Sequence, residues 1–327
     1  MSGEHIVSDW NQKIAAYNMP STLRDYLSEI SSKQIVFNSS GIDCSLVECY
    51  FGNLPSEKKL SEYPNIKWVH FGSIGTDKLS EEFIKKMSLT VTNSKKVNSS
   101  SVVTYCIGEL FRSCKANIHS RSSLKKNINT RNYFNNFFSS MIDYKDIVVA
   151  ILGYGDIGQE LVQVLQPMVK HINVATRSKR NNKKNVYFYS LKDIKEAAKK
   201  ATHVINVLPL HASTSEIVTY DVLNSLDSAY YICAGRAETH SEDSILNLIE
   251  NGNLRGASID VFGLPGGKIS ENLSGNDKIS LTPHISGWTS IFWEKQKKIL
   301  EHNINCFESN EYEHMKNIVF LKGERYG

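Results

Sequence analysis

Short apolar runs alternate with stretches of helical periodicity along most of the chain. Runs rich in β-branched and aromatic residues predict strands at 34–38, 46–51, 66–71, 89–93, 147–152, 171–175, 186–188, 203–208, 229–233, 257–261 and 279–282. Helical spacing predicts helices at 20–30, 80–86, 101–112, 191–200, 241–251 and 289–308, followed by a tail. Regular alternation of the two patterns is typical of parallel α/β domains.

The clearest change of period lies in residues 146–165, DIVVAILGYGDIGQELVQVL. A buried-type strand runs into the pattern G-x-G-x-x-G, formed by Gly153, Gly155 and Gly158, and a helix follows. In this arrangement the first glycine permits a tight turn, the second lets a pyrophosphate approach the backbone, and the third lets helix and strand pack closely. Unpaired N–H groups at the helix start attract phosphate. A glycine turn with a purely structural role is the alternative.

Composition limits the classes of protein. The 327 residues fit two domains, and 41% hydrophobic residues suffice for packed cores. A net charge of +4 is too small to argue for nucleic acid. The six cysteines are scattered without metal-binding spacing, so we expect reduced thiols. The N-terminal residues do not resemble a signal peptide, and no apolar run approaches the roughly 18 residues of a membrane span. We therefore expect a cytoplasmic protein without a metal site.

Two segments allow competing interpretations. Residues 112–131 carry basic residues and no acidic one, which would suit nucleic acid, but without an accompanying binding motif a solvated or subunit-contact segment is favoured. Ser73, Ile74 and Gly75 follow a predicted strand directly, where backbone N–H groups can hold an anion. A turn that simply needs glycine explains this second segment equally well.

Motif blocks further along the chain resemble those of the D-isomer-specific 2-hydroxyacid dehydrogenases. After GYGDIG come LPLHAST (208–214), ICAGRAE (232–238), GASIDVF (256–262) and LTPHISGW (281–288), in the order of that family. The stretches IKWVHFGSIGTD and VTNSKKVNSSSV also fit, so the resemblance extends over nearly the whole chain.

The resemblance implies an α/β fold of two doubly wound domains, one Rossmann-like and one flavodoxin-like. Residues 1–100 and 289–327 would form a discontinuous catalytic domain, and residues 101–288 a dinucleotide-binding domain inserted into it. The active site would lie between them, and a homodimer would form through the region after residue 101.

The resemblance also implies residue roles. Arg236 would bind the carboxylate of a small 2-oxo acid and polarise its carbonyl, and His284 would deliver or remove the proton of the hydroxyl. Both residue types suit this chemistry, since a guanidinium forms paired hydrogen bonds to a carboxylate and imidazole titrates near neutrality. Backbone N–H groups of Ser73, Ile74 and Gly75 would help to hold the carboxylate. The residues expected at the cofactor are Gly153, Gly155, Asp156, Ile157, Gly158, Thr176, Arg177, Ser178, Leu208, Pro209, Thr214, Ala234 and Asp260, with Asp260 at the nicotinamide carboxamide.

One departure from the family pattern concerns the cofactor. Where an acid would bind the adenosine ribose hydroxyls, residues 175–180 read ATRSKR. A carboxylate would repel a 2′-phosphate, whereas Thr176 and Arg177 can hold one, and Lys183 and Lys184 add positive charge. NADP is therefore favoured over NAD, and a plain exposed basic loop remains the alternative.

The second departure concerns the catalytic histidine. The family usually places a glutamate five positions after the aspartate of the DVF block, where it hydrogen-bonds the histidine, but this chain has Pro265. Its neighbours Gly263, Leu264, Gly266 and Gly267 carry no acid either, which leaves Glu271 and Asp277 as candidate substitutes.

The functional hypothesis that results is an NADPH-dependent reductase of a small 2-oxo acid, of the glyoxylate or hydroxypyruvate reductase kind. The rival is a dehydrogenase-like sensor or scaffold that binds NADP(H) without efficient turnover, as the missing glutamate permits. A nucleic-acid-binding protein that uses residues 112–131 is a third reading.

Overall fold

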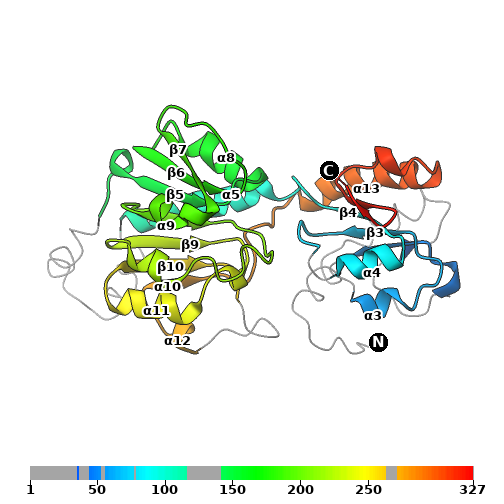
Figure 1. Ribbon diagram of the computed structural model, residues 1–327, viewed down its shortest axis with the longest axis horizontal. Helices are drawn as coiled ribbons and strands as arrows, with labels where there is room; N and C mark the ends of the chain where they lie inside the picture. Colours follow the sequence, from blue (N-terminus) through cyan, green and yellow to red (C-terminus); the bar gives the residue numbers. More distant parts are fainter. Residues whose placement is uncertain are drawn as a thin grey trace. The chain divides into compact units, whose positions relative to one another are not determined.

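The computed structural model describes residues 35–36, 44–52, 56–76, 79–115, 141–262 and 271–326 (Figure 1). The chain divides into two compact units. Unit 1 comprises residues 1–98 and 289–327, and unit 2 comprises residues 99–288.

Unit 2 is built, in its described part, on a seven-stranded parallel sheet. Its strands are β5 (Val148–Leu152), β6 (His171–Thr176), β7 (Val186–Ser190), β8 (His203–Asn206), β9 (Ala229–Cys233), β10 (Leu254–Ile259) and β11 (Ile279–Leu281). They lie in the order β11-β10-β9-β8-β5-β6-β7, so the direction of winding reverses between β5 and β8. Open α/β sheets bind ligands at such a switch point, beyond the carboxyl ends of the strands.

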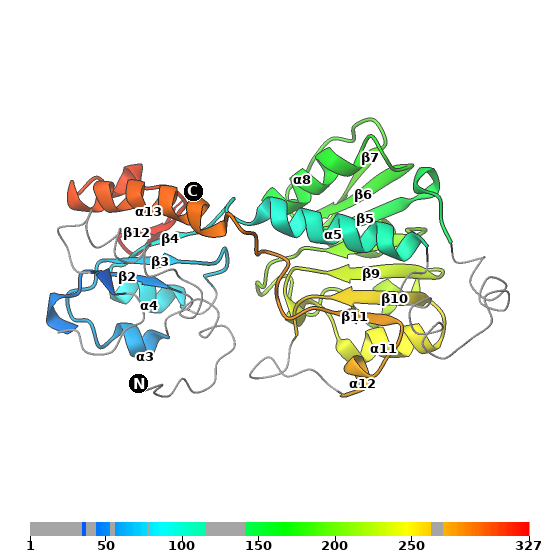
Figure 2. The ribbon, with the colours of Figure 1, turned by 180° about the vertical axis from the view of Figure 1, so that it is seen from behind.

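Helices cover both faces of this sheet. On one face lie α5 (Ser99–Cys114) and α8 (Asp156–Leu165), in front of the strands in Figure 2. On the other lie α9 (Ile194–Ala198), α10 (Tyr220–Asn224) and α11 (Glu242–Glu250), with α12 (Glu271–Ser274) beside α11 (Figure 1). The short 3₁₀ helices are η3 (Tyr144–Asp146), η4 (Leu191–Asp193) and η5 (Ala237–Thr239).

Strand β5 shows why its sequence is a continuous apolar run. Val148, Ala150 and Leu152 pack against α9 to α11, whereas Val149 and Ile151 pack against α5 and α8. Because successive side chains alternate between two covered faces, every position of the strand is buried.

Unit 1 carries the second sheet, in the order β1-β2-β3-β4-β12-β13. Its strands are β1 (Ile35–Val36), β2 (Cys49–Gly52), β3 (Trp68–Phe71), β4 (Thr90–Asn93), β12 (Ile318–Leu321) and β13 (Glu324–Arg325). The first four pair in parallel, and β12 pairs antiparallel with β4. The prediction of a tail after residue 308 is therefore wrong, because Phe320 is buried in the core of this unit and its strand closes one side of the parallel sheet.

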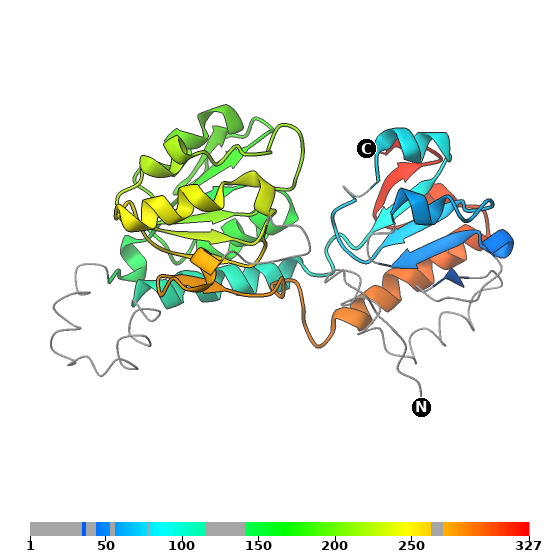
Figure 3. The same cartoon turned by 90° about the horizontal axis from the view of Figure 1, so that it is seen from below.

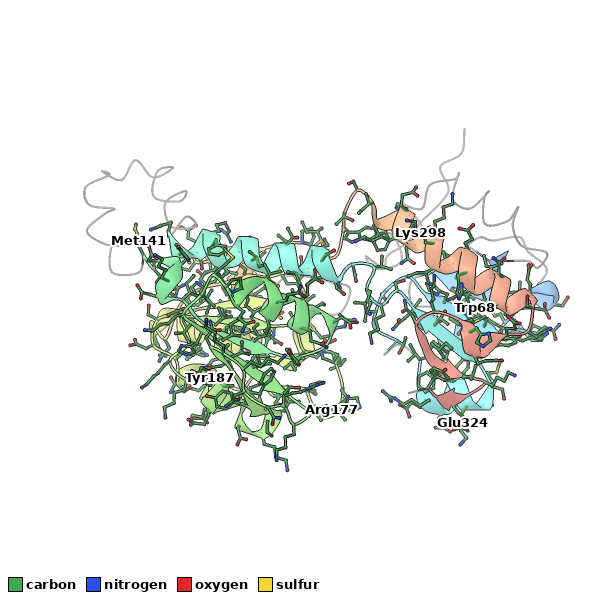
Figure 4. All side chains as sticks on the ribbon, turned by 90° about the horizontal axis from the view of Figure 1, so that it is seen from above. Trp68, Met141, Arg177, Tyr187, Lys298 and Glu324 are labelled. Atoms are coloured by element: carbon green, nitrogen blue, oxygen red, sulfur yellow. The ribbon has the colours of Figure 1, made fainter. Side chains whose placement is uncertain are left out.

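The helices of unit 1 pack on both faces of its sheet. They are α3 (Glu57–Leu60), α4 (Glu81–Lys86), α13 (Phe292–Glu308), η1 (Cys44–Leu46) and η7 (Tyr312–His314). Leu60 and Ile84 enter the core on one face, whereas α13 runs along the other (Figure 3). Trp68 lies beneath α13 with its ring 5.4 Å from that of Phe307 (Figure 4).

These sheets confirm the predicted α/β fold class. The helix predicted at 20–30 and most of the basic stretch 112–131 lie outside the described residues. All six cysteines are free thiols, and five of them are buried. Within the described ranges, no helix is long and apolar enough to cross a membrane.

Candidate active site at the carboxyl edge of the unit 2 sheet

The glycine turn lies between β5 and α8, at the switch point of the sheet. Gly153 has a φ of +107°, and a Cβ there would lie 3.2 Å from the carbonyl oxygen of Val207, which follows β8. A Cβ on Gly158 would lie 2.1 Å from the carbonyl oxygen of Gly153. A Cβ on Gly155 would meet no atom within 4 Å. Packing thus requires glycine at position 158 and the backbone conformation favours it at position 153, whereas Gly155 leaves open space at the start of α8.

That helix start has the features of an anion site. Gly155 occupies the N-cap position of α8 and provides no side-chain hydrogen bond to the helix, which continues through Asp156 and Ile157. The first N–H groups of a helix lack partners within the helix and carry partial positive charge. Because no side chain occupies the space at Gly155, a phosphate group can approach the backbone at this helix start.

Basic side chains gather beside this turn, after the carboxyl end of β6. Thr176 is buried at the end of the strand, and residues 177–184 are exposed. Arg177 projects from the surface (Figure 4), followed by Ser178. The guanidinium of Arg180 lies 5.8 Å from the ring centroid of Tyr154, the residue between the first two glycines. Within the described residues, Arg177 and Arg180 form no ion pair with a carboxylate, so both are available to a ligand phosphate.

The loop after β8 is held by side-chain hydrogen bonds. The Thr214 hydroxyl donates to the Pro209 carbonyl at 2.6 Å, and the Leu208 N–H donates to the side-chain oxygen of Asn206 at 3.1 Å. Leu208 and Thr214 are buried. This loop therefore lies beside Gly153 at the switch point of the sheet.

The turn after β9 places Arg236 next to that loop. The Ala234 N–H donates to the Asn206 carbonyl at 3.1 Å. A Cβ on Gly235 would lie 2.5 Å from the Leu208 carbonyl oxygen, so only glycine fits there. The half-buried Arg236 side chain bends back to donate to the Gly235 carbonyl at 3.0 Å.

Asp260, directly after β10, organises the loop that carries His284. One carboxylate oxygen accepts from the Thr282 hydroxyl at 2.6 Å and from the Ile285 N–H at 2.9 Å, and the other accepts from the Ser286 N–H at 3.0 Å. The His284 N–H donates to the Asp260 carbonyl at 2.9 Å. His284 adopts a φ of +56°, which is uncommon for a residue with a side chain and is enforced here by these bonds.

Asp260 and Arg236 lie close enough to His284 to influence its protonation. The His284 side chain is exposed at the edge of the sheet, yet the protein around the ring removes part of its hydration and lowers its pKa below 6.5. The Asp260 carboxylate opposes this shift, and the Arg236 guanidinium adds to it. The carboxyl ends of β9, β10 and β11 thus bring together a cation, an anion and a titratable ring.

The remaining predicted residues lie elsewhere. In unit 1, the loop after β3 is fixed by a bond from the Asn93 side chain to the Ile74 carbonyl at 2.7 Å and from the Ser73 hydroxyl to the Gly75 carbonyl at 3.0 Å. No acceptor within the described residues takes the N–H groups of Ser73, Ile74 or Gly75. Their predicted part in binding a carboxylate stays a prediction.

The position of the missing glutamate, Pro265 with Gly263, Leu264, Gly266 and Gly267, lies outside the described residues, and so does the side chain of Glu271. Asp277 precedes β11 whereas His284 follows it, which separates them by about 10 Å along the three strand residues. Asp277 is therefore placed at the amino edge of the sheet, and among the described carboxylates Asp260 is the one that acts on His284.

Sequence reasoning did not single out Asn206, Tyr154 or Thr282. Tyr154 and Thr282 lie inside recognised motif blocks and Asn206 lies two residues before one, but these residue types alone do not indicate a role. Within the described residues there is no group of three or more His, Cys, Asp or Glu side chains that could hold a metal ion.

Residues 116–286 match the model described as "D-isomer specific 2-hydroxyacid dehydrogenase, NAD binding domain", which is more than half of the chain. The chain belongs to this family. It is therefore a member of a family of oxidoreductases that act on small 2-hydroxy and 2-oxo acids, as the motif blocks predict.

Individual curated relatives are named as reductases of 2-oxo acids. A glyoxylate/hydroxypyruvate reductase A of Arabidopsis thaliana is 25% identical over 235 residues, which cover 70% of this chain and 71% of the relative. Hydroxyphenylpyruvate reductase of Plectranthus scutellarioides is 25% identical over 285 residues, 85% of this chain and 83% of the relative.

Solved structures share the fold. An NADPH-dependent glyoxylate/hydroxypyruvate reductase of Sinorhizobium meliloti has a TM-score of 0.73 at 21% identity, covering 94% of this chain and 97% of the other. D-lactate dehydrogenase of Aquifex aeolicus, in complex with NAD and lactic acid, has a TM-score of 0.75 at 18% identity, covering 92% and 97%.

Proposed function

We propose that this protein reduces a small 2-oxo acid to the D-2-hydroxy acid with NADPH, in the manner of a glyoxylate or hydroxypyruvate reductase. The observation that carries the proposal is the meeting of Arg236, Asp260 and His284 at the carboxyl edge of the unit 2 sheet, the edge that also carries the uncapped start of α8. The test is the oxidation of NADPH by the purified protein against a panel of 2-oxo acids. Tight NADPH binding without turnover of any of them at any pH would favour a sensor or scaffold instead.

The cofactor fits the residues at the switch point. Its diphosphate would lie at the start of α8 beside Gly155, and the adenosine ribose would lie at the end of β6 near Thr176 and Ser178. Leu208, Pro209 and Ala234 would flank the nicotinamide half. When bound, NADPH supplies the hydride of the reaction.

The protein's own groups would handle the carboxylate and the proton. Arg236 would hold the carboxylate and polarise the ketone through paired N–H donors, and protonated His284 would give its proton to the carbonyl oxygen. Asp260 would keep His284 in place through the loop bonds and accept a further hydrogen bond from the carboxamide. The amides of Ser73, Ile74 and Gly75 would contribute to carboxylate binding.

We expect NADPH to bind at least tenfold more tightly than NADH, a difference of about 1.4 kcal/mol. The reason is the group of basic side chains after β6, with Arg180 held over Tyr154 and Tyr154 packed 4.9 Å from Phe188. Arg177→Ala should weaken NADPH binding roughly tenfold or more, as for the loss of one charge-assisted hydrogen bond, and change NADH binding less than twofold. Fluorescence titration with each nucleotide measures both quantities.

Lys170→Ala is the matched control, because Lys170 is an exposed cation just before the amino end of the same strand, β6. It should leave both affinities unchanged. Equal affinities of the wild type for NADPH and NADH would refute the cofactor assignment.

The lowered pKa of His284 predicts a pH dependence. Reduction needs the protonated ring, so kcat/KM should fall as the pH rises through an apparent pKa below about 6.5, and activity at neutrality should be modest. Oxidation of the hydroxy acid needs the neutral ring and should rise over the same range. A reduction limb above about pH 7.5 would show that another acid, with Glu271 the remaining candidate, raises the pKa of the ring.

Homodimer formation, an NADP-specific role and a cytoplasmic location stay predictions. Sedimentation of the purified protein tests the first of them directly.

A further inference from the structure

Asn206, the last residue of β8, is fully buried and uses both ends of its side-chain amide. Its nitrogen donates to the Thr239 hydroxyl and to the Tyr231 hydroxyl, each at 2.8 Å. Its oxygen accepts from the Leu208 N–H at 3.1 Å. A buried amide with all of these partners is fixed in one orientation.

One branch of these bonds ends at the residue expected to bind substrate. The Thr239 hydroxyl, which accepts from Asn206, donates its own proton to the Arg236 carbonyl at 2.6 Å. Thr239 is fully buried, so bulk water does not compete for its hydroxyl group. Arg236 occupies the N-cap position of η5, whose last residue is Thr239.

A second branch ends at the loop expected to hold the nicotinamide half of the cofactor. The Asn206 side chain accepts from Leu208, and its backbone carbonyl accepts from Ala234. The two loops touch at Gly235, where even a Cβ would lie 2.5 Å from the Leu208 carbonyl oxygen. Asn206 therefore holds the two segments together beside this close contact.

We propose that Asn206 is a positioning residue that, through Thr239, sets the place of Arg236 relative to the cofactor loop. The inference rests on the proposed function, because it assumes that Arg236 receives the substrate carboxylate. Productive reduction requires the ketone carbon and the hydride donor at near-contact distance, and a displacement of about 1 Å can cost 10²-fold in rate. A side chain that binds both supporting segments controls that distance without touching either ligand.

The kinetic test compares Asn206→Ala, Thr239→Val and Thr239→Ser. Thr239→Val keeps the shape of the side chain but removes the hydroxyl link, whereas Thr239→Ser keeps the link. We expect Asn206→Ala and Thr239→Val to lower kcat/KM for the 2-oxo acid at least tenfold, mainly through KM, with NADPH affinity reduced less. Thr239→Ser should stay within twofold of wild type. The double variant Asn206→Ala/Thr239→Val should lose no more kcat/KM than the more impaired of the two single variants, because both substitutions act through one chain of bonds.

Asn173→Ala is the matched control, since Asn173 is also a buried asparagine of this sheet, in β6, and donates to the Ala197 carbonyl at 3.0 Å. It should lower Tm and leave kcat/KM within twofold. A kinetic loss in Asn173→Ala equal to that in Asn206→Ala, or equal losses in Thr239→Ser and Thr239→Val, would show a general effect of stability and overturn the proposal.

Amide hydrogen exchange separates this inference from the proposed function. Exchange at residues 234–239 should accelerate at least tenfold in Asn206→Ala and in Thr239→Val, but not in Asn173→Ala or Thr239→Ser. This readout needs no turnover, so a wild type inactive on every 2-oxo acid would refute the proposed function while exchange still decides the link between Asn206 and the Arg236 turn. Unchanged exchange in Thr239→Val would overturn the link even if Asn206→Ala does not fold.

Discussion

His284→Asn should lose turnover while it retains both ligands. General acid catalysis typically contributes 10²- to 10⁴-fold, and asparagine cannot donate a proton to the developing alkoxide. Asparagine is the better replacement here because His284 has a φ of +56°, a conformation that asparagine tolerates and alanine does not. We expect kcat to fall by about 10²- to 10⁴-fold with NADPH affinity and substrate KM within a few-fold of wild type. Steady-state NADPH oxidation and fluorescence titration measure these quantities.

His284→Ala should lose at least as much turnover, and it should also unfold at a lower temperature because its backbone is strained. His314→Asn is the control, a substitution of an exposed histidine in unit 1. Near-native kcat in His284→Asn on the best substrate would mean that another group delivers the proton.

The fold of unit 2 could be predicted well because its signals are local. Each residue of β5 is apolar since both faces of the sheet are covered, and the glycines that follow are dictated by contacts such as that of Gly158 with the Gly153 carbonyl. The change from a continuous apolar run to helical spacing is visible within the twenty residues 146–165. The prediction therefore needed no knowledge of distant contacts.

Strand β12 could not be predicted in the same way. Its pairing with β4 joins residues more than two hundred positions apart, for example Phe320 with Val91. A four-residue apolar run between polar turns is compatible with a strand or with a tail. What makes it a strand is that β4 pairs with β3 on one side only and leaves its other side open for β12.

The candidate site shows a similar division. Motif order pointed to Arg236, Asp260 and His284, because family resemblance carries residue types and spacing. It did not show that both oxygens of Asp260 fasten the loop after β11, nor that Asn206 supports the turn of Arg236. Those roles depend on which buried polar groups meet in three dimensions, and a lone asparagine in a sequence does not reveal its partners.

Arg236→Ala should cause a second large loss, this time in the use of the 2-oxo acid. A guanidinium can make two parallel charge-assisted hydrogen bonds to a carboxylate, each contributing about 1.5–3 kcal/mol. Loss of both corresponds to roughly 10²- to 10⁴-fold in kcat/KM. NADPH affinity should stay close to wild type, because the diphosphate and ribose would be held at α8 and β6. Saturation kinetics with the best 2-oxo acid and a nucleotide titration make the comparison.

Arg236→Lys sharpens this prediction, because lysine keeps the charge but cannot form the planar paired bonds. If geometry matters, Arg236→Lys should recover only a small part of the lost kcat/KM; full recovery would show that positive charge alone suffices. Arg177→Ala serves as the reciprocal control, since it should weaken NADPH and leave the KM of the 2-oxo acid unchanged. If Arg236→Ala instead weakened NADPH and spared that KM, Arg236 would belong to the cofactor site, and the carboxylate would have to be bound by other groups, such as the amides of Ser73 to Gly75.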